Sequence, residues 1–252
     1  GYLISLRFGV YINKDKIIEV LKIRLKKDCY KIKCGFVGGT VLCQVLADNG
    51  MEELAYHILF QEDFPGWMHC INLGATTIWE RWNSVLDDGS ISGTGMNSLN
   101  HYAYGSVMEY VYRNIAGIKE TSCGFRSVRF VPQLNARLKY VKYTYDSISG
   151  AYVSNWYIHK DGRVTVHFEV PFGCSAVAVL PGTGGEEVQL EAGCDFHLQG
   201  ICSQLLAERL RQGIRRFLRV SMVTSVAVKK YFVFSFSTTG MTVVEPISMP
   251  AH

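Results

Sequence analysis

The sequence predicts an α+β fold of several domains, in which a helical, toroid-like region is followed by an antiparallel β-sandwich. Apolar residues recur at helical spacing before about residue 120, and after about residue 125 they alternate or form β-rich runs. The chain has 252 residues, of which 48% are hydrophobic, so it can bury a sizeable core. We therefore expect a helical domain over residues 1–120, a β domain over 121–200 and an atypical basic tail over 201–252.

Four segments of the N-terminal half carry helical patterns. Residues 15–28 place isoleucines, leucines and a valine on one broad face, with lysines and arginines opposite. Residues 37–46 and 52–60 predict two more helices, and residues 96–118 predict a long helix that begins near an Asn-Ser pair. Residues 64–95 are rich in Gly, Trp and Thr and are too irregular for one helix. Helices joined by long aromatic loops are typical of an α/α toroid, whose loops at one end form a site.

The strand patterns of the second half are short and are separated by prolines and glycines. The predicted strands are residues 140–145, 150–159, 163–170, 176–180 and 187–191. Asp161-Gly162 predicts a hairpin turn between the second and the third of them. Such a set predicts an antiparallel sheet domain of roughly 70 residues, enough for a small sandwich.

The C-terminal tail differs from the rest of the chain in charge. Residues 205–252 hold seven Lys or Arg and two Asp or Glu, whereas the whole chain has a net charge of +4. Residues 204–218 predict a basic amphipathic helix, and residues 220–236 predict one or two strands. The arginines of that helix could contact an anionic surface, but a solvated face on a terminal helix is the more frequent explanation.

Composition excludes several classes of protein. Outside the tail the chain carries a net charge of −1, so it lacks the basic footprint of a nucleic-acid binder. The apolar run at residues 220–228 is ended by Lys229 and Lys230 before it could span a bilayer, and no stretch resembles a signal peptide. The eight cysteines show no CxxC pair and no zinc spacing with histidine. We expect no metal or other cofactor, reduced thiols and a cytoplasmic setting.

The segment GATTIWERWN at residues 74–83 carries the strongest chemical signal. If a threonine caps a short helix here, Trp79 and Trp82 lie on one face, with Glu80 beside them. Two indoles near a carboxylate suit a sugar site, since a pyranose stacks on Trp while the carboxylate binds hydroxyls or activates water. The alternative is two core tryptophans with Glu80 paired to Arg81 or to a backbone N–H, and for an isolated motif this is the more frequent arrangement.

Neighbouring residues favour the sugar site. Trp67 follows a Phe-Pro-Gly turn and adds a third indole just upstream. Asn97, Asn100 and His101 lie at the start of the predicted long helix, where side chains that face a pocket can bind sugar hydroxyls. A lone His at such a place is usually structural, paired to a backbone carbonyl. This run of adjacent polar and aromatic residues is harder to explain by packing alone.

Four landmarks carry a resemblance to a known family. They are CGFVG at residues 34–38, GATTIWERW at 74–82, MNSLNHYAYG at 96–105 and GAYVSNW at 150–156. With these landmarks, residues 30–185 resemble the C-terminal part of bacterial α-L-rhamnosidases, glycoside hydrolase family 78. The resemblance implies that the helical half belongs to a six-hairpin (α/α)6 barrel, present here in part, and that the β half is the sandwich that follows it.

The resemblance also implies a reaction, the inverting hydrolysis of terminal α-L-rhamnose from glycosides or oligosaccharides. One carboxylic acid protonates the leaving oxygen while a second carboxylate deprotonates the attacking water. The family's general base corresponds to Glu80, and the sugar-contacting His corresponds to His101. By the same resemblance Trp79 or Trp82 lies by the pocket, and so does Trp67.

The chain departs from the family pattern in one respect that matters for activity. The family's general acid lies on earlier barrel helices, and no matching segment occurs in these 252 residues. We therefore expect an incomplete catalytic domain that hydrolyses little by itself, and helix faces that favour self-association. The alternatives are a non-catalytic carbohydrate-binding remnant and an interaction module built on the basic tail.

Overall fold

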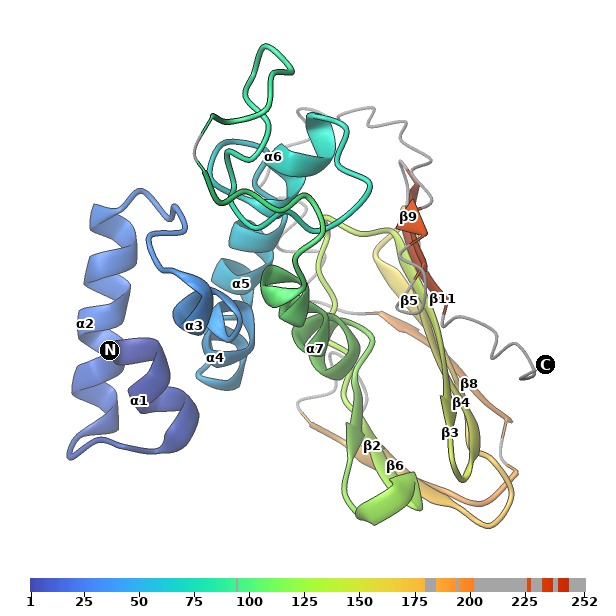
Figure 1. Cartoon of the computed structure of the whole chain (residues 1–252). Helices are drawn as coiled ribbons and strands as arrows, with labels where there is room; N and C mark the ends of the chain where they lie inside the picture. Colours follow the sequence, from blue (N-terminus) through green and yellow to red (C-terminus); the bar gives the residue numbers. More distant parts are fainter. Residues whose placement is uncertain are drawn as a thin grey trace. The chain divides into compact units, whose positions relative to one another are not determined.

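The computed structural model divides the chain into two compact units, residues Gly1–Tyr110 and Val111–His252 (Figure 1). The boundary between them lies somewhat earlier than the one expected at residue 120. The structure describes residues 1–93, 95–179, 185–193 and 195–201 and, in the tail, residues 226–227, 233–237 and 240–244. The helix predicted over residues 204–218 lies outside the described residues.

The N-terminal unit is helical. Its elements are α1 (Tyr2–Phe8), α2 (Lys14–Lys27), α3 (Phe36–Gly39), α4 (Leu42–Asp48), α5 (Glu52–Leu59), α6 (Trp67–Asn72), the 3-10 helix η1 (Ala103–Val107) and α7 (Met108–Tyr110). The helix predicted over residues 15–28 is confirmed as α2, whose first turn is capped by the Asn13 side chain on the backbone N–H of Lys16. The helix predicted over 52–60 is confirmed as α5, and the one predicted over 37–46 is divided into α3 and α4.

The core of this unit lies between α4 and α5. Leu46, Ala55 and Ile58 have no exposed surface, and the Cys43 thiol donates to the backbone oxygen of Ala55. Gly50, with φ of 71°, forms the turn between the two helices, a backbone conformation that favours glycine. The two helices therefore form a hairpin, the unit from which α/α toroids are built.

The prediction of one long helix over residues 96–118 is wrong for residues 96–102, about the first third of that segment. Residues 96–102 form no regular element, and helical structure begins at Ala103 with η1. The backbone groups of residues 98–101 bind an upstream loop instead of one another. His101 N donates to Ile78 O at 2.7 Å, and Ser98 is bonded to Glu80. These cross-loop bonds replace the bonds that a helix would make within itself.

The C-terminal unit begins with the π-helical turn η2 (Val111–Ile115) and is otherwise built from strands. They are β1 (Ile118–Glu120), β2 (Ser127–Phe130), β3 (Tyr140–Ser147), β4 (Gly150–Ile158), β5 (Arg163–Glu169), β6 (Ser175–Val179), β7 (Glu187–Leu190), β8 (Asp195–Ile201), β9 (Val226–Ala227), β10 (Val233–Ser237) and β11 (Gly240–Val244). All five predicted strands are confirmed as β3 to β7, and β9 and β10 lie in the tail segment predicted to hold one or two strands. β1, β2, β8 and β11 were not predicted.

The strands form two sheets, in the orders β1-β2-β6-β7 and β8-β5-β4-β3-β11-β10-β9. Most neighbours are antiparallel, but β2 pairs with β6 and β3 pairs with β11 in parallel. The predicted α+β fold is confirmed, and these two parallel pairs are the exceptions to the antiparallel pairing that was expected. β2 and β6 are separated in sequence by β3, β4 and β5 of the other sheet, and such a crossover allows parallel pairing. The tail strands extend the larger sheet instead of standing apart from it.

Aromatic side chains join the two sheets. The Phe130 ring of β2 stacks on the Phe168 ring of β5, with centroids 4.5 Å apart, and both residues are fully buried. Trp156 of β4 is also buried, and its indole N–H donates to Ile115 O at 2.9 Å. Trp156 is thus part of the core of the C-terminal unit.

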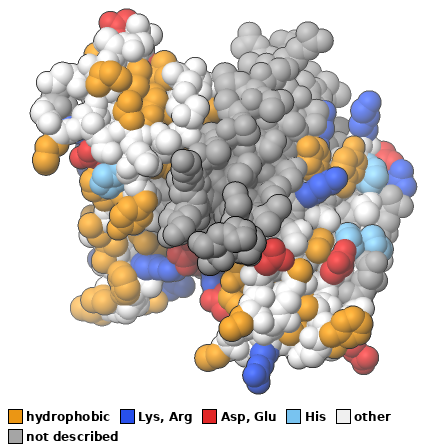
Figure 2. All heavy atoms as spheres, turned by 45° about the vertical axis from the view of Figure 1, so that its right-hand side comes forward, with side chains coloured by type: hydrophobic (Ala, Val, Ile, Leu, Met, Phe, Trp, Pro, Cys, Tyr) orange, Lys and Arg blue, Asp and Glu red, His pale blue; other side chains and the backbone are white. Residues whose placement is uncertain are grey.

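Hydrophobic side chains are also exposed on the surface (Figure 2). In the N-terminal unit they include Phe8, Val10, Ile12 and Ile23, on or next to α1 and α2. The predicted self-association would use such a surface, and it stays a prediction. No helix among the described residues is both long enough and apolar enough to cross a membrane.

Candidate functional site

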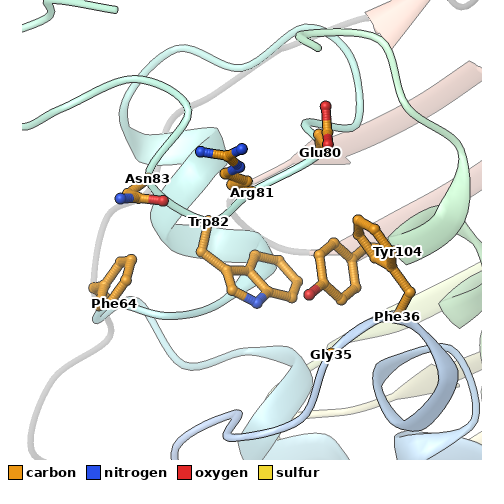
Figure 3. A pocket seen from close by; sticks show the side chains of 8 residues that line it. All are labelled: Gly35, Phe36, Phe64, Glu80, Arg81, Trp82, Asn83 and Tyr104. Carbon is orange, nitrogen blue, oxygen red and sulfur yellow. The ribbon is translucent and has the colours of Figure 1, made fainter. Parts of the chain in front are cut away.

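The candidate site is a hollow of about 280 Å³ in the N-terminal unit. Its lining comes from the start of α3, the turn before α6, the loop at residues 80–83 and η1 (Figure 3). The lining residues are Gly35, Phe36, Phe64, Glu80, Arg81, Trp82, Asn83 and Tyr104. Of the six residues predicted for the site, Glu80 and Trp82 therefore line the hollow.

Three aromatic rings form one wall of the hollow (Figure 3). Trp82 stacks on Tyr104 with ring centroids 4.0 Å apart, and the ring centroids of Phe36 and Tyr104 are 5.1 Å apart. Behind Tyr104 lies Gly39 of α3, where a Cβ atom would stand only 2.7 Å from the tyrosine ring. Glycine at this position therefore allows the ring to pack against the helix, which sets the position of the wall.

Trp67 supports this wall and does not line the hollow. It is 6% exposed, and its indole N–H donates to the backbone oxygen of Tyr104 at 2.9 Å. Its ring also meets Trp82 edge to face, with centroids 5.1 Å apart. Trp67 was predicted to lie near the pocket. It lies behind the lining residues Tyr104 and Trp82 and contacts both of them.

Trp79, which was predicted for the site, is buried and is not among the residues that line the hollow. No helix forms over residues 76–84, so the helical spacing does not apply to the two indoles, although Trp82 packs against the cluster that contains Trp79. Trp79 is 6% exposed and packs with Cys70 and Ala75. Burial raises the pKa of the Cys70 thiol to about 12, in keeping with a dry cluster.

Glu80 is half-buried and is bonded to Ser98 on the facing loop. Its backbone N–H donates to Ser98 O at 2.9 Å, and its carboxylate oxygen Oε2 accepts from the backbone N–H of Ser98 at 2.8 Å. The side-chain hydroxyl of Thr77 also donates to Leu99 O, so the two loops are joined at several points. An ionised carboxylate has about four acceptor positions, so this pairing leaves acceptor capacity for a hydroxyl or a water.

His101 lies next to the aromatic wall. Its ring stacks on Phe36 with centroids 4.9 Å apart and an angle of 15° between planes. Its Nδ1 accepts from the backbone N–H of Ala103 at 3.3 Å, so in the neutral imidazole the other nitrogen, Nε2, carries the proton and can donate. Asn100 is exposed, with its backbone N–H bonded to Ser98 Oγ, and neither residue is among those that line the hollow.

Sequence reasoning did not single out Phe36, Phe64, Arg81, Asn83 or Tyr104 for the site. All except Phe64 lie within or directly beside the landmark segments. Their position in those segments is the feature of the sequence that could have indicated a place in the site. Burial raises the pKa of the Tyr104 hydroxyl, and the nearby Cys34 thiol adds to this effect. Tyr104 therefore remains neutral at physiological pH and serves as a wall residue. Among the described residues, no three His, Cys, Asp or Glu side chains are placed to hold a metal ion.

Two family profiles match the chain. The bacterial alpha-L-rhamnosidase 6 hairpin glycosidase domain matches residues 1–115, and the bacterial alpha-L-rhamnosidase C-terminal domain matches residues 117–195. An alpha-L-rhamnosidase of Alteromonas sp. (strain LOR) is 38% identical over 187 residues, which are 72% of this chain and 20% of that protein. One of Streptomyces avermitilis is 36% identical over 188 residues, or 71% of this chain and 18% of that protein. The chain thus spans about a fifth of the length of the curated relatives it matches.

Solved structures show the same relationship. The alpha-L-rhamnosidase of Streptomyces avermitilis complexed with L-rhamnose has a TM-score of 0.74 and 28% identity, covering 79% of this chain and 21% of that one. The native enzyme of Aspergillus terreus has a TM-score of 0.74 and 29% identity, covering 78% of this chain and 23% of that one. The chain therefore carries a part of the six-hairpin glycosidase domain of bacterial alpha-L-rhamnosidases, followed by their C-terminal domain.

Proposed function

We propose that this chain provides the rhamnose-binding wall and the general base of a site for inverting hydrolysis of α-L-rhamnosides. One observation carries the proposal: the Glu80 carboxylate and the Trp82–Tyr104 stack line the same hollow. A related structure, that of Streptomyces avermitilis, was solved in complex with L-rhamnose, which supports this sugar as the ligand.

The sugar would lie against the aromatic wall. The C–H face of a pyranose is apolar and stacks on indole and phenol rings, whereas its hydroxyls need polar partners. Trp82 supplies the stacking face. His101, with Nε2–H as a donor, and Asn100 lie on the loop that follows and are the proposed partners of the hydroxyls.

Glu80 would accept the proton of the attacking water. The backbone N–H of Ser98 holds one carboxylate oxygen and so fixes the orientation of the group. The carboxylate keeps acceptor capacity for the water, which would attack the anomeric carbon from the face opposite the leaving oxygen. The second carboxyl group, which protonates the leaving oxygen, would come from outside these 252 residues.

A binding experiment tests the sugar site without requiring turnover. In ligand-observed NMR titrations, L-rhamnose should bind the wild-type chain, and Trp82→Ala should weaken binding roughly tenfold because the stacking face is lost. Phe172→Ala, which removes an exposed ring of the C-terminal unit, is the matched control and should bind as the wild type does. Absence of binding to the wild type, or unchanged binding in Trp82→Ala, would contradict the proposal.

A hydrolysis assay tests the catalytic part. A polypeptide of these 252 residues should cleave 4-nitrophenyl α-L-rhamnoside at least about 10²-fold more slowly than a full-length relative, since general acid catalysis contributes 10²–10⁴-fold. Any residual turnover should disappear in Glu80→Gln. Turnover equal to that of the full-length relative, or residual turnover that survives in Glu80→Gln, would show that the roles are assigned wrongly.

A further inference from the structure

We infer that Phe64 determines specificity for the group attached to the rhamnose, by stacking on an aromatic leaving group. This inference rests on the proposed function and adds to it a residue that the sequence did not point to. Phe64 lines the same hollow as Glu80 and Trp82, yet it is 51% exposed, whereas Tyr104 on the aromatic wall is buried.

The Phe64 ring is supported from inside the unit. It meets the His69 ring edge to face, with centroids 5.4 Å apart, and the residue after it, Pro65, has its backbone oxygen bonded by the side-chain N–H of Gln61 at 2.8 Å. A large apolar ring that is held in place and still half exposed presents a binding surface at low entropic cost.

The position of the Phe64 ring relative to Glu80 indicates that the ring contacts the leaving group and not the attacking water. In an inverting displacement the water and the leaving group lie on opposite faces of the sugar, so the leaving group points away from the general base. In Figure 3, Phe64 and Glu80 lie on opposite sides of Trp82. A sugar stacked on Trp82 with its water at Glu80 would therefore direct its anomeric substituent toward Phe64.

The chemistry of the ring favours an aromatic substituent. Aromatic rings prefer offset-stacked or edge-to-face contacts with one another, which contribute beyond the area that they bury. Asn83 lines the same hollow as Phe64 and is exposed, so it offers donors and an acceptor to polar groups on such a ring. A methyl substituent could use neither residue to the same extent.

Paired NMR titrations of the full 252-residue chain test this inference. The wild type should bind 4-nitrophenyl α-L-rhamnoside roughly two- to tenfold more tightly than methyl α-L-rhamnoside. Phe64→Ala should remove this preference, because it should lower the affinity for the aryl glycoside more than the affinity for the methyl glycoside. Phe64→Tyr, which keeps the ring, should retain the preference, and so should the control Phe172→Ala.

The outcomes separate the inference from the function on which it rests. If the methyl glycoside binds and Phe64→Ala retains the preference for the aryl glycoside, Phe64 is not the specificity residue, although the rhamnose site stands. Equal binding of both glycosides to the wild type would also overturn the inference. If the wild type binds neither glycoside, the proposed function fails as well.

Discussion

Two indole groups make the same hydrogen bond in the two units of the molecule. In the C-terminal unit, Trp156 donates to Ile115 O, and in the N-terminal unit, Trp67 donates to Tyr104 O, each at 2.9 Å. Both indoles are buried. The carbonyl of Ile115 belongs to a fully buried residue at the end of η2, whereas the carbonyl of Tyr104 belongs to a residue that lines the hollow.

The difference lies in what surrounds each bond. Around Trp156, strands paired over six or more residues fix the backbone on both sides, so the bond contributes mainly to stability. Trp67 begins the short helix α6 and Tyr104 lies in the short helix η1, and between these helices the chain runs through loops that are joined by a few separate bonds. Substitutions in the first region should therefore change stability, and substitutions in the second should change ligand binding.

The largest effect is expected from the centre of the sandwich. Phe130→Ala removes a fully buried ring that stacks on Phe168, and it should lower the free energy of unfolding by about 3–5 kcal/mol. Urea denaturation followed by circular dichroism would measure this. Phe172→Ala, at an 87% exposed position, should change it by less than about 0.5 kcal/mol. A loss below about 1 kcal/mol for Phe130→Ala would show that the two sheets do not pack as described.

An intermediate effect is expected at Trp156. Trp156→Phe keeps an aromatic ring in the core but leaves the buried oxygen of Ile115 without its donor, which should cost about 1–3 kcal/mol of stability. L-Rhamnose binding should stay the same when both proteins are compared well below their unfolding transitions. A weaker affinity in this variant would mean that the two indoles do not have separate roles.

The smallest change in stability is expected at Trp67. Trp67→Phe removes the donor to Tyr104 O and should cost about 1 kcal/mol. Because Tyr104 and Trp82 are then less firmly held, the affinity for L-rhamnose should fall roughly two- to threefold. The same NMR titration on both tryptophan variants makes the comparison direct. Equal affinities in the two variants would contradict a role for Trp67 in shaping the wall.

The strands and the main helices could be predicted because their periodicity is local. In β5, for example, burial alternates along the strand as the sequence pattern indicates, and α2 has its cap and its charged face within the segment itself. The parallel pairing of β2 with β6 depends on residues far apart in the chain, and β1 and β2 are too short to show a clear period.

The site could be predicted only in part, for a related reason. Glu80 and Trp82, which were singled out because their residue types suit a sugar site, line the hollow, whereas Trp79 was singled out by a helical spacing in a segment that forms no helix. In the loop at residues 76–84, bonds to the facing loop hold Thr77, Ile78 and Glu80 in place. Phe64 belongs to no landmark segment, so only the folded chain brings it to the hollow.

The exchange of bonds between Glu80 and Ser98 restricts which acid can serve at this position. The backbone of residue 80 is tied to the same residue that holds the carboxylate, so the reach of the side chain is determined by its number of methylene groups. An aspartate would keep the negative charge but fall short by one carbon, and it could no longer satisfy both the Ser98 amide and a water in the hollow. An equal negative charge on a shorter side chain is therefore not enough. Glu80→Asp should affect activity about as much as removal of the carboxylate does.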